Sequence, residues 1–238
     1  MDYFNEFLFK VIPIHVLELL AAIAGTYYLK NNTNTLLVNT YMIYFLWYTF
    51  INELIGTYAP IAYFTNYEYF GFVKNTIFSD NIWLYNIYLI VSFMFFIYYF
   101  RHFSLGKKNI RTTNIVILIY LLTSFIYLIY SEMFFKSYSM IVSIVGTLLL
   151  LYAIIQFYFN VLKNDIILDL KSYLPIYISV GILVFSLCVA PLDIFFHYFS
   201  SENDIFVSLR INILLFANIF MYSTFILGFI ICTKKKIK

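Results

Sequence analysis

Charged side chains are scarce in this sequence. Only 11% of its 238 residues are Asp, Glu, Lys or Arg, whereas 63% are hydrophobic and the mean hydropathy is +0.86. A soluble domain has about 25% charged and about 45–50% apolar residues, so this chain could not cover itself with a hydrated surface. The same scarcity excludes intrinsic disorder, which needs a polar and highly charged chain. We therefore expect an integral membrane protein.

Cysteine, glycine and proline are also few. The two cysteines, Cys188 and Cys232, lie in apolar runs and cannot supply a disulfide framework or a four-thiolate metal site. Seven Gly and four Pro exclude a collagen-like or linker-like chain. The acidic stretch 1–6 lacks the basic leader of a signal peptide, so the first apolar run is interpreted as a retained helix.

Seven apolar runs are long enough to cross a bilayer, which takes about 20 residues in a helix. Their expected ranges are 7–29, 36–58, 82–100, 114–131, 138–160, 174–198 and 208–232. Apolar and polar residues do not alternate in these runs as they would in a transmembrane barrel. The sequence predicts an all-α fold, a single domain over 1–238 made of seven transmembrane helices, with no soluble domain.

The basic residues of the connections predict the orientation, because Lys and Arg are retained on the cytoplasmic side. Eleven fall on one side, including the stretches 107–111 and 234–238, and four on the other: Lys10, Lys74, Lys136 and Arg210. We therefore expect the N-terminus outside and the C-terminus inside. The abundant Asn, Ile, Lys, Tyr and Phe suit a bacterial gene, and hence a multi-pass protein of the inner (plasma) membrane.

Basic stretches beside helix ends indicate topology signals or contacts with anionic lipid headgroups rather than a nucleic-acid partner. The expected partner is the lipid bilayer. Aromatic residues are numerous, with 24 Tyr and 28 Phe, and are expected as anchoring rings at the membrane interfaces. Trp83 with Tyr85, and Tyr98 with Tyr99, fit that position.

Ionisable and amide side chains inside the apolar runs are the informative ones, because a charge near the bilayer centre costs on the order of 3 kcal/mol. His15 and Glu18 are three residues apart, and Asp193 and His197 are four residues apart, so each pair shares a helix face. The candidate residues for a ligand site or a structural polar network are His15, Glu18, Asn52, Glu53, Asp193, His197, Arg210 and Asn218.

The predicted topology brings most of these groups to one depth. His15, Glu53, Asp193, His197 and Arg210 fall in the outer half, and Glu18 lies close to the middle. Pro191 is expected to kink the sixth run, because it breaks the backbone hydrogen-bond ladder. Three interpretations stay open: an outward-facing polar cavity for a ligand, an internally satisfied packing network, or a proton or ion pathway.

Enzyme signatures are missing from the sequence. Neither a His-Glu-x-x-His zinc motif nor a Gly-x-Ser-x-Gly nucleophile elbow occurs. The last run, 209–232, contains no lysine, which excludes a retinal Schiff base there. We expect no catalytic residue, no metal site and no cofactor.

The helix count and three local runs resemble small bacterial seven-helix membrane proteins that are similar to the membrane-embedded sensory regions of histidine kinases. The runs are Leu46-Trp-Tyr-Thr-Phe-Ile-Asn-Glu-Leu-Ile-Gly-Thr-Tyr58, Trp83-Leu-Tyr-Asn-Ile-Tyr88 and Ile178-Ser-Val-Gly-Ile-Leu183. The resemblance implies a sensor that is read by a separate cytoplasmic partner, because no kinase is attached.

The hypothesis from sequence is a receptor-like or accessory sensory module that takes a small ligand from outside and signals to a cytoplasmic or membrane protein partner. A small transporter or ion pathway, and a structural subunit of a membrane complex, are the alternatives.

Overall fold

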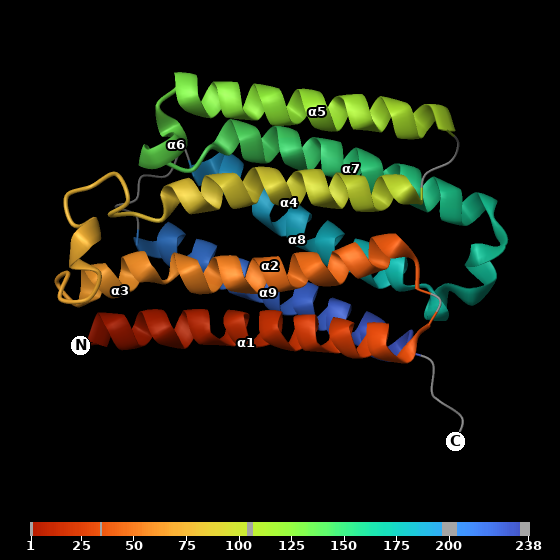
Figure 1. The fold of residues 1–238 in the computed structure, drawn as a ribbon, viewed down its shortest axis with the longest axis horizontal. Helices are drawn as coiled ribbons and strands as arrows, with labels where there is room; N and C mark the ends of the chain where they lie inside the picture. Colours follow the sequence, from red (N-terminus) through yellow and green to blue (C-terminus); the bar gives the residue numbers. More distant parts are fainter. Residues whose placement is uncertain (1, 34, 104–106, 197–203, 234–238) are drawn as a thin grey trace.

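The computed structural model describes residues 2–33, 35–103, 107–196 and 204–233, and within these ranges every regular element is helical. Seven long helices run side by side and alternate in direction (Figure 1). They are α1 (Asp2–Asn31), α2 (Leu37–Gly56), α4 (Ile82–His102), α5 (Lys107–Tyr130), α7 (Met140–Lys163), α8 (Leu174–Phe196) and α9 (Asp204–Ile231). Four short helices join them: α3 (Tyr58–Phe64), η1 (Gly71–Val73), α6 (Met133–Lys136) and η2 (Asp165–Ser172).

The predicted runs coincide with the long helices, and the differences lie at their ends. The second run divides, because α2 ends at Gly56 and α3 begins two residues later. The fourth run is predicted at 114–131, but α5 begins at Lys107. The helix includes the polar residues that precede the apolar run. The long connection 59–81 therefore contains α3 and η1 rather than an extended loop.

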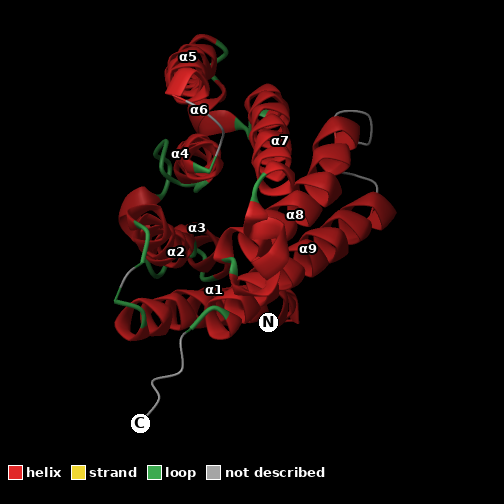
Figure 2. Ribbon diagram, turned by 90° about the vertical axis from the view of Figure 1, so that its right-hand side faces the viewer, coloured by secondary structure: helices red, strands yellow, loops and turns green. Residues whose placement is uncertain are grey.

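Six of the long helices form a closed ring when the bundle is viewed nearly end-on (Figure 2). α1 packs between α2 and α9, α2 continues to α4, α4 contacts α7, and α8 joins α7 to α9. α5 lies outside this ring against α4. Side chains of these six helices that point inward can therefore meet in the interior of the ring.

Six helices in the described part of the chain are long and apolar enough to cross a membrane. They are α1, α4, α5, α7, α8 and α9 over their apolar parts, and α2 is not among them. The polar residues of α2 explain this, because amide side chains such as those of Asn39 and Asn52 lower its mean hydropathy. Both of these residues are buried inside the bundle. Its exposed face is apolar and includes Leu37, Ile51, Leu54 and Ile55.

Aromatic side chains fill the interior of the bundle in the half that is nearer the C-terminal ends of α1 and α4. Phe45 stacks on Phe95 with their ring centroids 4.1 Å apart, and Phe100 meets Phe157 at 5.5 Å. Tyr99, which was expected at a membrane interface, is fully buried and donates a hydrogen bond of 3.0 Å to Asn39 Oδ1. That expectation is wrong, because the hydroxyl finds a partner inside the bundle.

The connections between long helices alternate between the two ends of the bundle (Figure 1). Lys30, Arg101 and Lys163 close α1, α4 and α7 at one end, which we call the basic end. The opposite end carries α3, η1, α6 and the start of α9, and we call it the N-terminal end.

Phe157 and Phe159 on α7 test the aromatic packing, because Phe157 is fully buried and Phe159 is 53% exposed. We expect Phe157→Ala to lower the free energy of unfolding by about 3 kcal/mol through the cavity that it leaves. Phe159→Ala should cost less than about 1 kcal/mol. Unfolding titrations in mixed detergent micelles measure both, and equal losses would contradict this packing.

Candidate functional site

One polar cluster lies between α1, α2, α4 and α9, toward the N-terminal end. His15 and Glu18 are one turn apart on α1, with His15 Nδ1 3.4 Å from Glu18 Oε2. Tyr222 of α9 donates a hydrogen bond of 3.1 Å to the other oxygen, Glu18 Oε1. Glu18 is only 3% exposed, and Tyr222 is buried beside it. A carboxyl group is therefore held inside the bundle by residues of two helices.

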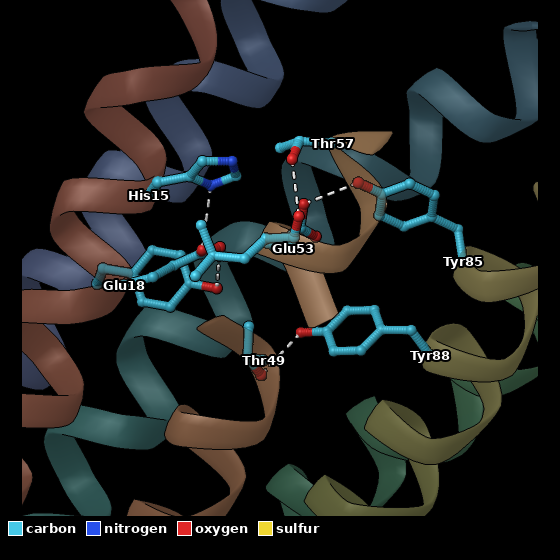
Figure 3. Close-up of polar contacts among 9 residues, drawn as sticks. His15, Glu18, Thr49, Glu53, Thr57, Tyr85 and Tyr88 are labelled. Atoms are coloured by element: carbon cyan, nitrogen blue, oxygen red, sulfur yellow. Dashed lines mark hydrogen bonds and ion pairs between the residues drawn. The ribbon is translucent and has the colours of Figure 1, made fainter. Parts of the chain in front are cut away.

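Glu53 of α2 completes this cluster. Tyr85 of α4 donates a hydrogen bond of 2.8 Å to Glu53 Oε2, and one turn below it Thr49 and Tyr88 form a second α2–α4 bond of 3.1 Å. Figure 3 shows His15 and Glu18 from α1 directed toward Glu53 from α2. We call His15, Glu18, Glu53, Tyr85 and Tyr222 the Glu18–Glu53 cluster.

Several buried polar atoms at this level make no hydrogen bond with the described residues. They are Nε2 of His15 and Nδ2 of Asn52, which form no ion pair either, and Nδ1 of His15 and Oε2 of Glu18, which form the 3.4 Å ion pair with each other. A buried polar atom without a partner costs about 1–3 kcal/mol, and native structures satisfy nearly all of them with protein groups, water or ions. The cluster thus has the capacity to hydrogen-bond a further polar group.

A second polar cluster surrounds Asp193 of α8. Ser143 of α7 donates a hydrogen bond of 2.5 Å to Asp193 Oδ2, and the hydroxyl of Tyr138 donates one of 3.4 Å to the same oxygen. Arg210 of α9 lies near enough for its charge to act on the carboxylate.

The structure therefore divides the candidate residues that the sequence placed at one depth. His15, Glu18 and Glu53 meet, whereas Asp193 faces α7 rather than α1 and α2. Asn218 bonds the Leu214 carbonyl of its own helix at 2.9 Å, one turn before Tyr222. α8 continues as one helix through Pro191. His197 lies outside the described residues.

The tyrosine and serine partners were missed from the sequence. Tyr85 was expected as an interface anchor, yet its hydroxyl bonds Glu53, and Tyr222 and Ser143 carried no signal at all. With 24 tyrosines in the chain, no pattern distinguishes Tyr85 and Tyr222, which bond the carboxyl groups of the Glu18–Glu53 cluster, from the rest. Only the pairing of helices α2 with α4 and α1 with α9 selects them.

Among the described residues no group of three or more His, Cys, Asp or Glu side chains is arranged to hold a metal ion. Comparisons with protein-family models, with curated proteins and with solved structures find no match to this chain. The chemistry of the two clusters is therefore the basis for the proposals below.

The Tyr222 hydroxyl offers a direct test of the Glu18–Glu53 cluster. Because its hydrogen bond is to a buried carboxyl group, we expect Tyr222→Phe to lower the free energy of unfolding by about 1–3 kcal/mol. Tyr152→Phe is the matched control, since Tyr152 is on the exposed face of α7. A double-mutant cycle with Glu18→Gln, followed by unfolding in micelles, measures the pair. Additive effects of Tyr222→Phe and Glu18→Gln would contradict the contact.

Proposed function

We propose that the chain crosses the inner (plasma) membrane seven times, with its N-terminus outside. α2 is the helix that this proposal adds to the six apolar ones. Its 20 residues span about 30 Å at 1.5 Å per residue, which matches the bilayer core. It packs between α1 and α4, with its amides buried and Ile51, Leu54 and Ile55 exposed.

Reporter fusions test this topology. We expect a periplasmic reporter to be active after residue 75, in the connection between α3 and α4, and a cytoplasmic reporter to be active after residue 32. Fusions after residues 131 and 173 should report outside and inside, respectively. Reporters on the same side after residues 32 and 75 would show that α2 does not cross.

We propose further that the protein is a receptor-like or accessory sensory module, and that the Glu18–Glu53 cluster is its ligand site. The observation that supports this most is the set of buried polar atoms on α1 and α2 that make no hydrogen bond; two of them, His15 Nε2 and Asn52 Nδ2, form no ion pair either. Four helices contribute to the cluster through hydrogen bonds or ion pairs. A ligand there would change the contacts of all four helices together.

The charges favour a ligand that carries a positive charge or several hydrogen-bond donors. Glu18 and Glu53 are two carboxyl groups with one imidazole near them, that of His15, which is paired with Glu18. Tyr85 and Tyr222 each occupy a single carboxyl oxygen. Because Glu18 Oε2 already pairs with His15, a small amine would bond the other oxygen of Glu53 and balance the second charge, since buried charges need a partner.

Binding without transport is favoured by the aromatic packing below the cluster. A pathway from the Glu18–Glu53 cluster to the basic end would have to pass a layer of rings in successive contact, which are those of Phe45, Phe95, Phe96, Tyr99 and Phe100. The partner of a sensor would instead contact the basic end, as the resemblance to membrane sensory regions implies. Signalling then requires the ligand to bind two arrangements of the bundle with different affinities.

Thermal unfolding of the purified protein tests the ligand site. We expect methylammonium or ethanolammonium chloride to raise the Tm of the wild type in a saturable way. The free energy of unfolding should rise by about 2.7 kcal/mol when the amine concentration is 100 times its Kd. Glu53→Gln should abolish the rise, because it removes the charge that the amine would pair with. Asp193→Asn is the matched control and should keep it, since Asp193 belongs to the other cluster.

Proteoliposomes separate the alternatives. Uptake of the labelled amine by the wild type would favour a transporter over a sensor. Equal Tm values for the wild type with and without every amine, together with a lower Tm for Glu53→Gln than for the wild type, would favour a packing role for the cluster.

A further inference from the structure

The segment from Tyr58 to Phe78, which includes α3 and η1, is unusual for a connection between helices. Eight of its 21 residues are aromatic, and only Glu68 and Lys74 are charged. A water-exposed segment of this length would have about a quarter of its residues charged. Its composition is therefore closer to that of the apolar helices than to that of a solvated loop.

The apolar side chains of this segment point outward. Tyr63, Tyr69, Phe72 and Ile77 are 69%, 61%, 80% and 58% exposed, respectively. Smaller apolar residues, Ala59, Ala62 and Val73, are the buried ones. Leaving so many large apolar groups in water is unfavourable, at roughly 25 cal/mol per Å² of apolar area. Large exposed apolar groups concentrated in one segment are typical of an interaction surface.

The backbone of the segment is suited to a poorly hydrated environment, because successive turns bond its amides internally. Tyr67 N–H donates to Ala62 O at 2.7 Å, Val73 N–H to Phe70 O at 3.1 Å and Thr76 N–H to Val73 O at 3.1 Å. Irregular backbone is not tolerated in contact with the hydrocarbon core. The headgroup boundary, where aromatic rings accumulate, has no such restriction.

Hydrogen bonds fix the segment to the ends of α2 and α4. The Tyr58 hydroxyl lies 2.9 Å from Phe78 O and 2.8 Å from Asp80 O, and it accepts a bond of 3.1 Å from Trp83 Nε1. Asn81 Nδ2 donates to Gly56 O at 2.7 Å. The segment is thus a folded part of the α2–α4 hairpin and extends past the end of α2 (Figure 1).

We propose that residues 58–78 form an interfacial platform, whose exposed rings enter the boundary between headgroups and acyl chains of the bilayer on the N-terminal side. The platform continues the apolar outer face of α2, where Ile51, Leu54 and Ile55 are exposed. A lipid surface is its partner because the patch lies at the level where those helices leave the membrane. The platform holds the α2–α4 hairpin, and with it Glu53, at a fixed depth.

Site-directed spin labelling of the full chain in vesicles of phosphatidylethanolamine and phosphatidylglycerol tests this proposal. Phe72→Cys is made in a background with Cys188→Ala and Cys232→Ala, and a nitroxide is attached. We expect high accessibility to oxygen and low accessibility to a water-soluble nickel complex. Leu148→Cys, on the exposed face of α7, provides the lipid-facing reference, and Lys136→Cys, at an exposed charged position of the same end, provides the aqueous one.

Tyr69→Cys is a second platform variant, and it should give the same result as Phe72→Cys. Nickel accessibility at both positions equal to that of Lys136→Cys would overturn the proposal, because the rings would then be in water. Protection from both reagents would also overturn it, since protein and not lipid would cover the patch. These outcomes do not depend on a ligand at the Glu18–Glu53 cluster.

Discussion

A carboxyl group inside an apolar bundle must find its partners within the protein, and this constraint organises the interior of the molecule. Glu18 and Glu53 are held by tyrosine hydroxyls of neighbouring helices, and Asp193 by Ser143 and Tyr138. The bond of Glu18 joins α1 to α9, which are not consecutive, and the bond of Glu53 joins α2 to α4 across a long connection. The acidic residues therefore determine which helix faces meet as well as supplying chemistry.

The two halves of the ring have different physical characters. Toward the basic end, stacked and edge-on rings such as Phe45, Phe95 and Phe157 pack without polar groups except isolated pairs like Tyr99 with Asn39. Toward the N-terminal end, the interior holds carboxyl, imidazole and amide groups whose hydrogen-bonding capacity is incompletely used. A rigid half beside a polar half is an arrangement in which a ligand could change helix contacts locally without opening a route through the bundle.

The platform and the polar cluster are neighbours through a single turn of α2. Gly56 accepts a hydrogen bond from Asn81 at the base of the platform, and it packs so closely on Tyr85 that a Cβ would meet the hydroxyl at 2.8 Å. The same hydroxyl donates to Glu53. Any displacement of the platform at the membrane surface would therefore act on Glu53, which links our two proposals physically while leaving each separately testable.

Helix positions and the choice of candidate residues were predictable, because apolar runs of about 20 residues and polar groups within them are visible in one dimension. α4 and α8 begin where the sequence placed them, and His15 and Glu18 share a face through their spacing. The end of α2 was less predictable, since Gly56, Thr57 and Tyr58 do not by themselves distinguish a continuing helix from the turn into α3.

The sequence alone determined the all-helical class, the apolar segments and the presence of a few polar side chains in them, since these depend on composition and local periodicity. The tertiary structure decided which of those side chains meet. It separated Asp193 from Glu18 and Glu53, and it selected Tyr85 and Tyr222 as partners from 24 tyrosines. The physical reason is that depth along a helix is fixed by residue number, whereas the direction of a side chain depends on which helices pack against it.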